Sequence, residues 1–189
     1  MRVLQLLPEL KFGGVERGTV DLSEHLTKLG HQSAVVSAGG GLTEQLSNHG
    51  AKHFLLPIAK KNFLAIKQYK NLRDIYREFK PDIIHVRSRF PAWINVLALK
   101  GLSSSKPIVI STFHGLYSKP FYSKSMSYAN DIIAISKTVQ EYVFKNYDVD
   151  HSRVHLIYRG CDIDEFNTSP PSEAWSNSWY KEFPQTSDK

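Results

Sequence analysis

The first 29 residues predict a strand, a glycine-containing loop and a helix in direct succession. The apolar run Val3–Leu7 predicts a buried strand, and Gly13–Gly14 lies in the loop that follows it. After the glycines, apolar positions recur at spacings of four and three, which places them on one helix face: Val15, Thr19, Leu22, Leu26 and Leu29. A helix N-terminus presents unpaired N–H groups, and glycine lets a phosphate come close to the backbone. The segment therefore predicts an anion site, although a tight turn explains a double glycine equally well.

Strand and helix patterns alternate along the rest of the chain. Strands are predicted at Ser33–Ser37, Lys52–Leu56, Asp82–Val86, Ile108–Phe113, Asp131–Ile135 and Val154–Ile157. Helices are predicted at Val15–Leu29, Leu42–His49, Phe63–Phe79, Ala92–Lys100 and Ser136–Asn146. This alternation predicts an α/β fold with a Rossmann-like, doubly wound, mostly parallel sheet. Ligands of such sheets bind at the carboxyl ends of the strands, so the polar residues that follow each strand are the site candidates.

The length of 189 residues predicts one domain followed by a tail. From residue 168 onward Pro, Ser and Asn become common, so we expect a domain at 1–167 and a connector or tail at 168–189. Because Cys161 is the only cysteine, an internal disulfide and a cysteine-rich metal site are excluded. A cytoplasmic location is expected, since no run approaches the roughly 20 apolar residues of a membrane span and no signal peptide is evident.

The most basic part of the chain lies between residues 59 and 80. Seven basic residues oppose only Asp74 and Glu78 there, for a net charge of +5. The basic residues are Lys60, Lys61, Lys67, Lys70, Arg73, Arg77 and Lys80. We favour a helix that covers the sheet and turns its charges to solvent. The alternative is a basic face that binds anionic lipid headgroups.

Other common site types find no match in the sequence. It contains no Ser-His-Asp order, no Walker loop and no G-x-G-x-x-G, and its aromatic residues do not interleave with basic ones as in nucleic-acid binders. Asp162 and Asp164 form a D-x-D pair without an evident third ligand, so no metal is expected. His114 directly follows the predicted strand Ile108–Phe113. It either binds a sugar or a phosphate there, or it bonds to a neighbouring carbonyl.

Taken in order, five segments carry a specific resemblance. They are GGVER after the first strand, KPDIIHVRS, STFHG, DIIAISK and VHLIYRGCDIDEF. From Met1 to about Phe166 the chain resembles the N-terminal half of a GT-B glycosyltransferase of the retaining family 4, which includes many lipopolysaccharide, capsule and glycolipid enzymes. The resemblance implies two Rossmann-like domains with the active site between them.

The resemblance also implies roles on the donor side of that active site. Gly13 and Gly14 would approach the donor phosphates, and Glu16 would orient their loop. His114 matches the histidine of the family's H-G turn, which contacts the transferred sugar and assists the reaction. The other donor-side positions are Gly115, Ser136 and Lys137.

The acceptor side and the connector are implied in the same way. The acceptor would face Arg87, Ser88 and Arg89. The connector positions are Arg159, Gly160 and Asp162, within a segment that the family usually writes N-G-V-D. Arg159 stands where the family has Asn. The polar contact that the family makes at this turn is therefore not implied for this chain.

The resemblance implies a nucleotide-sugar donor and a cell-envelope glycan or lipid-linked acceptor, with no metal, cofactor or nucleic acid. The leaving diphosphate would help to deprotonate the acceptor. The second domain, which binds most of the donor and carries paired glutamates, would begin where this chain stops, so the isolated chain is expected to be inactive. The alternatives are a non-catalytic half-protein that pairs with a donor-binding subunit, a peripheral membrane module, and a sugar-nucleotide epimerase. Packing of Trp175 and Trp179 on the domain would favour a self-contained module.

Overall fold

The computed structural model describes residues 1–60, 62–102, 106–117, 120–160 and 170–186. Seven parallel strands form one sheet in the order β3-β2-β1-β4-β5-β6-β7. Their bounds are β1 Arg2–Leu6, β2 Gln32–Ser37, β3 Lys52–Leu55, β4 Ile83–Val86, β5 Ile108–Phe113, β6 Asp131–Ala134 and β7 Val154–Leu156. All seven predicted strands are confirmed to within one residue at each end. Most of them are short apolar runs between polar segments.

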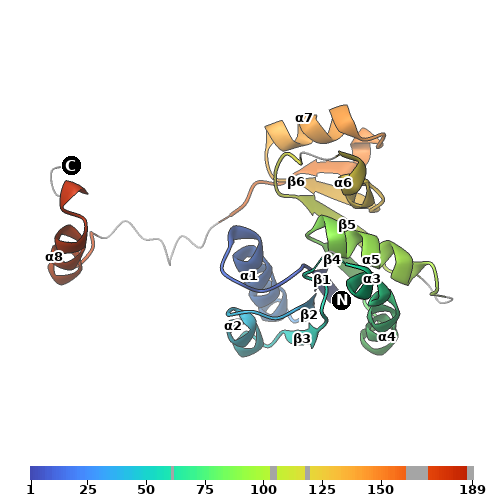
Figure 1. Cartoon of the computed structure of the whole chain (residues 1–189), viewed down its shortest axis with the longest axis horizontal. Coiled ribbons are helices and arrows are strands. Elements are labelled where there is room, and N and C mark those ends of the chain that lie inside the picture. The colour runs from blue at the N-terminus through green and yellow to red at the C-terminus, as the bar shows by residue number, and fades with distance from the viewer. Residues whose placement is uncertain (61, 103–105, 118–119, 161–169, 187–189) are drawn as a thin grey trace. The chain divides into compact units, whose positions relative to one another are not determined.

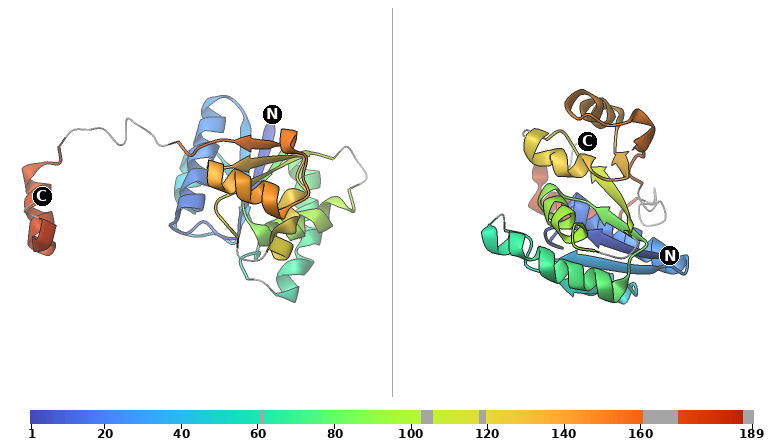
Figure 2. Two further views of the ribbon diagram at one scale, coloured as in Figure 1. Left: turned by 90° about the horizontal axis from the view of Figure 1, so that it is seen from above. Right: turned by 90° about the vertical axis from the view of Figure 1, so that its right-hand side faces the viewer.

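Helices cover both faces of the sheet, with α1 and α2 on one side and α3, α4 and α5 on the other (Figure 1). Figure 2 shows the twist of the sheet from two further directions. The α-helices are α1 Gly14–Lys28, α2 Thr43–Asn48, α3 Phe63–Lys67, α4 Tyr69–Phe79, α5 Arg89–Leu99, α6 Pro120–Ser127, α7 Lys137–Asn146 and α8 Glu173–Glu182. Two 3-10 helices lie at His151–Arg153 and Pro184–Thr186.

Each face of the sheet has its own apolar core. Successive residues of a strand point to opposite faces, so Val36 joins the larger cluster and Val35 the smaller one. The larger cluster packs Leu72 of α4 and Ile94 of α5 against the sheet. The smaller cluster includes Val20 of α1. Burial on both faces explains why the central strands are apolar without alternation.

The predicted helix Phe63–Phe79 is wrong in one respect, because it is two helices. The N–H of Gln68 donates to the carbonyl of Ala65 at 3.1 Å, three residues back, which tightens and ends α3. Gln68 is then the N-cap of α4. A side-chain cap begins α3, since Asn62 accepts from the N–H of Ala65 at 2.8 Å. The basic residues of this region are therefore divided between two short helices.

The structure contains a helix, α6, that the sequence did not reveal. Its buried positions are mostly small and polar, so the segment lacks an apolar period: Ser123, Ser125, Met126 and Ser127. The hydroxyl of Ser125 donates to the carbonyl of Arg89 at 3.0 Å. Side-chain hydrogen bonds to backbone thus replace part of the apolar packing of this helix.

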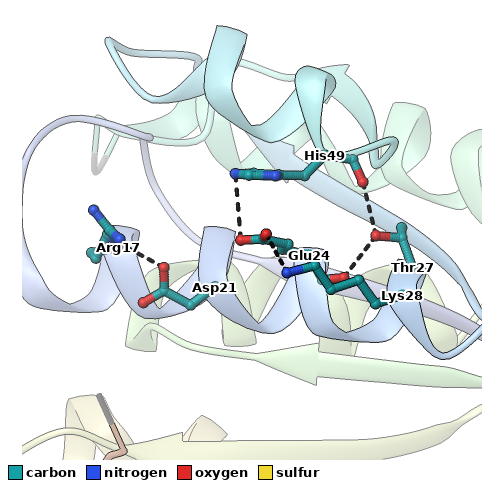
Figure 3. Close-up of polar contacts among 6 residues, drawn as sticks. All are labelled: Arg17, Asp21, Glu24, Thr27, Lys28 and His49. Atoms are coloured by element: carbon teal, nitrogen blue, oxygen red, sulfur yellow. Dashed lines mark hydrogen bonds and ion pairs between the residues drawn. The ribbon is translucent and has the colours of Figure 1, made fainter. Parts of the chain in front are cut away.

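A polar contact joins α1 to the end of α2 (Figure 3). The carboxylate of Glu24 lies 2.7 Å from Nζ of Lys28 and 3.5 Å from Nε2 of His49. The hydroxyl of Thr27 donates to the carbonyl of His49 at 2.8 Å. Ion pairs at the surface stabilise a fold by only about 0.2–1 kcal/mol. These contacts therefore connect the C-cap residue of α2 to α1 and add little to the stability of the fold.

The chain divides into two compact units, Met1–Tyr158 and Arg159–Lys189. Within the second unit, the Ser172 hydroxyl accepts from the N–H of Trp175 at 3.3 Å and begins α8. The rings of Trp175 and Trp179 stack with centroids 5.3 Å apart. The aromatic tail thus forms a helix. Across the part of the chain that the structure describes, no helix combines the length and apolar character needed to cross a membrane.

Candidate functional site

The direction of the chain through the sheet reverses between β1 and β4. From β1 the chain runs to β2 on one side, whereas from β4 it runs to β5 on the other. In doubly wound sheets the loops after two such strands diverge, and ligands bind at the carboxyl edge between them. This place is the switch point of the sheet. The segments that follow β1, β4 and β5 accordingly define the candidate site.

The loop after β1 presents the start of α1. Gly13 is the N-cap of the helix, with extended backbone angles (φ −177°, ψ 164°), and it carries no side chain to cap the helix. A Cβ at Gly13 would collide with the carboxylate of Glu16, so the absence of a side chain lets this carboxylate fold back on the loop. The loop is anchored at Leu10, whose N–H donates to the Gly39 carbonyl at 2.8 Å. Both predicted glycines, Gly13 and Gly14, are exposed at the helix N-terminus, as an anion site requires.

Arg87 lies directly after β4 and is 6% exposed. Its Nη1 donates to Oε1 of Gln5, which is fully buried on β1, at 3.3 Å. The amide nitrogen of Gln5 donates in turn to the carbonyl of Thr19 at 3.0 Å and to the hydroxyl of Ser23 at 2.8 Å. Gln5 therefore connects α1, which follows the glycine loop, to the arginine that follows β4.

A second polar pair lies on the neighbouring strands. Nε2 of His85, on β4, is 2.7 Å from the hydroxyl of Thr112 on β5, and both residues are buried. Burial lowers the pKa of His85 well below its usual value, and electrostatic interactions with Arg87 and His114 lower it further. At neutral pH His85 is therefore an uncharged hydrogen-bonding group.

His114 begins the loop after β5 and is partly buried. The backbone N–H of His114 donates to the hydroxyl of Tyr117 at 3.4 Å. The ring of Tyr117 lies 5.3 Å from that of Phe113 and 4.6 Å from the guanidinium of Arg89. Burial raises the pKa of Tyr117, which keeps its hydroxyl protonated. These contacts hold the H-G turn, His114–Gly115, against the apolar core.

The predicted residues at the next helix starts have structural roles as well. Ser88 is the N-cap of α5 and Arg89 its first residue, so this helix begins three residues before the predicted start. The Ser136 hydroxyl accepts from the N–H of Val139 at 3.2 Å and caps α7. Lys137 follows it and is exposed. A serine cap of this kind stabilises the helix by about 1 kcal/mol.

Four predicted residues belong to the second unit of the chain or lie outside the described residues. Arg159 and Gly160 are exposed and belong to the second unit of the chain. Asp162 and Lys61 lie outside the described residues. Among the residues that the structure describes, no group of three or more His, Cys, Asp or Glu is placed to hold a metal ion.

The predicted basic face is only partly a free surface. Arg73 donates from Nε to the carbonyl of Ala98 at 3.0 Å and from Nη2 to that of Leu97 at 3.2 Å. It therefore satisfies the end of α5, where carbonyls lack helical partners. Arg77 pairs with Asp74 at 2.7 Å. Lys60, Lys67 and Lys70 are exposed.

Sequence reasoning did not select Gln5, His85, Thr112 or Tyr117 as site residues. The first three are polar side chains within otherwise apolar buried strands, and such interruptions are a usable signal. A buried polar group needs a hydrogen-bond partner. The sequence does not show which residue on another strand provides it.

The comparisons with known proteins agree with this architecture. A sequence model of the Glycosyltransferase Family 4 matches residues 12–165. The chain belongs to this family. A search of curated proteins gave no match. The family match favours a glycosyltransferase over the epimerase alternative.

Solved structures show the same fold over nearly the whole chain. A glycosyltransferase from Rickettsia africae ESF-5 is 30% identical, with a TM-score of 0.80, over 99% of this chain and 50% of that one. Anabaena Alr3699/HepE, solved with UDP and glucose, is 17% identical with a TM-score of 0.73, over 96% and 50%. The lipopolysaccharide outer core galactosyltransferase WaaB is 18% identical with a TM-score of 0.71, over 92% and 49%. The family 4 chain thus spans about half the length of these proteins and corresponds to an N-terminal GT-B domain.

Proposed function

We propose that this domain is the acceptor-side half of a retaining glycosyltransferase. It would act with a second domain to move a sugar from a nucleotide donor to a cell-envelope glycan or lipid-linked acceptor. The observation that carries the proposal is the switch point between β1 and β4: the exposed glycine loop, Arg87 and His114 follow the adjacent strands β1, β4 and β5 of a family 4 domain. The match to about half of each relative supports the action of this domain together with a second, donor-binding domain.

The proposed donor-side groups suit the charge of a nucleotide sugar. Gly13 and Gly14 offer exposed backbone at the N-terminus of a 15-residue helix, where a diphosphate is stabilised. The relative HepE has been solved with UDP-glucose, which supports a nucleotide diphosphate donor. Ser136 and Lys137 would border the cleft at the start of α7. Catalysis would consist mainly of positioning and of stabilising the departing diphosphate, with no metal required.

His114 would contact the transferred sugar, and Arg87, Ser88 and Arg89 would face the acceptor. The buried contacts support fixed positions for these groups, because Gln5 holds Arg87 and the Tyr117 hydroxyl holds the backbone of His114. WaaB, a lipopolysaccharide galactosyltransferase, supports a cell-envelope acceptor.

The test uses the polypeptide encoded by the native open reading frame, together with any separately encoded donor-binding partner. Sugar transfer is measured with a panel of nucleotide sugars and cell-envelope lipid acceptors. We expect His114→Ala to lower kcat by about 10²–10³, the range for loss of one transition-state contact. The matched control is His25→Ala, an exposed histidine on α1.

Two results would contradict the proposal. Equal kcat for His114→Ala and His25→Ala would remove His114 from the reaction. Sugar transfer by the 189-residue chain alone would show that no second domain is needed.

A further inference from the structure

An apolar groove lies at the β2–β3 side of the carboxyl edge, beside the proposed active site. Its volume is about 580 Å³, within the range of small-molecule sites. Ala38, directly after β2, forms one wall, and its N–H donates to the carbonyl of Pro8 in the loop after β1 at 2.9 Å. The groove therefore adjoins the loop that carries the glycines.

The walls of the groove are apolar and come from three segments. They are formed by Ala38, Pro57, Ala59, Leu64 and Ala65. Leu64, on α3, is 69% exposed although it is a large apolar side chain. Burial of such a side chain by a ligand is favourable, since it removes apolar surface from water.

The rim of the groove is positively charged. Lys60 and Lys67 lie at its edge and are exposed, and none of its described lining residues is acidic. Arg73 and Arg77, on α4, contact the α5 carbonyls and Asp74. Lys60 and Lys67 lie on the α3 side of the break at Gln68, beside the groove, and the two arginines lie on the α4 side.

We infer that this groove binds the alkyl chain of an anionic, single-phosphate lipid, with the phosphate at Lys60 and Lys67. An apolar chain matches the walls, and the charge of the rim matches a phosphate. Because the groove adjoins the loop that carries the glycines, this lipid is the carrier of the sugar acceptor; only that last step rests on the proposed function. The lipid-binding surface is then the groove around α3 rather than the whole basic face from Lys60 to Lys80.

Binding is measured by isothermal titration calorimetry on the 189-residue chain, with monomeric dodecyl phosphate and butyl phosphate as probes. We expect dodecyl phosphate to bind at least tenfold more tightly, a factor that corresponds to burial of about two methylene groups. Leu64→Asp should weaken dodecyl phosphate binding at least tenfold. The side chain of Leu64 is largely exposed, so this variant is expected to fold.

The phosphate contact is tested with the double variant Lys60→Glu/Lys67→Glu. It should bind dodecyl phosphate at least tenfold more weakly than the wild type. The control, Lys70→Glu/Lys145→Glu, changes the net charge equally at two exposed lysines that do not line the groove, and it should bind as the wild type does.

Three outcomes would overturn the inference: equal affinity for the two probes, undiminished binding by Leu64→Asp, or equal losses in the two double-lysine variants. A Leu64-dependent dimer in sedimentation, without lipid binding, would also overturn it and assign the groove to a second copy. Because these measurements do not involve sugar transfer, they separate failure of this inference from failure of the proposed function.

Discussion

Two regions at the same edge of the sheet differ in how their polar groups are held. The switch-point cluster is defined as Gln5, His85, Arg87, Thr112 and His114. Its side chains are buried or partly buried, and two pairs of them, Gln5 with Arg87 and His85 with Thr112, are in contact across strands. In the α3 groove, the apolar walls are open to water and the charges lie at the rim. The first region requires fixed geometry, because a buried polar group without its partner is costly.

This difference in burial indicates which residues affect the stability of the fold and which affect ligand binding alone. Substitution of a buried member of the cluster leaves its partner without a hydrogen bond, so we expect the free energy of unfolding to fall. Substitution in the groove exposes or removes surface that solvent already reaches. Four measurements on the 189-residue chain test this contrast, in order of expected effect.

The largest effect is expected at Phe113, the fully buried residue that precedes His114. Phe113→Ala removes ring contacts with Tyr117 and Tyr147 at centroid distances of 5.3 and 5.4 Å. We expect the free energy of unfolding to fall by about 3–5 kcal/mol, as measured by urea denaturation. Phe121→Ala, at a phenylalanine that is 84% exposed, is the control and should change it by less than about 0.5 kcal/mol. A loss similar to that of the control would show that the H-G turn does not depend on this core contact.

The next effect is expected from Gln5→Leu. The substitution keeps the volume roughly constant but leaves Arg87, Ser23 and the Thr19 carbonyl without the Gln5 amide. The expected loss in free energy of unfolding is about 1–3 kcal/mol, the cost of an unsatisfied buried polar group. Gln32→Leu, at an exposed glutamine on β2, should be nearly neutral. Equal stability of the two variants would mean that the bridge from α1 to Arg87 contributes nothing to the fold.

A pH-dependent effect is expected from His85. Its pKa is lowered in the folded state, so the unfolded chain takes up a proton first when the pH falls below the ordinary value of about 6.5. The stability contribution is complete above that pH and is lost as the pH falls toward the folded-state pKa. His85→Gln should therefore flatten the dependence of the unfolding free energy between pH 6.5 and more acidic values. The burial-lowered pKa of His53 leaves a residual slope in both proteins.

The control for this pH profile is His25→Gln, at an exposed histidine. Its profile should follow that of the wild type. An unchanged slope in His85→Gln would contradict the assignment of His85 as a neutral buried group.

The smallest effect is expected from Leu64→Asp in the groove. Because Leu64 is 69% exposed, the free energy of unfolding should change by less than about 0.5 kcal/mol, although lipid binding is lost. Thermal or urea denaturation measures this. A loss of more than 1 kcal/mol would show that α3 depends on Leu64 for its own packing, and the contrast between the two regions would disappear.

The sequence alone determined the order of the elements and the edge at which the site lies. Short apolar runs between polar segments predict strands without knowledge of their partners, and the alternation with helices predicts a parallel sheet. The positions after the strands, including Gly13, Arg87 and His114, follow from that pattern. The match of five segments to family 4 followed from their order along the chain, and the family comparison confirms it.

The hydrogen-bond partners of these residues depend on the tertiary structure and could not be predicted from the sequence. Gln5 and Arg87 lie 82 residues apart in the chain, and strand pairing brings their side chains together. Tertiary contacts also determine the role of Arg73. Its charge suggested a surface role, but its guanidinium donates hydrogen bonds to carbonyls of α5. Local sequence patterns indicate which residues are buried, because buried positions favour apolar side chains. Partner choice depends on sheet register and helix packing, which are set by contacts between distant segments.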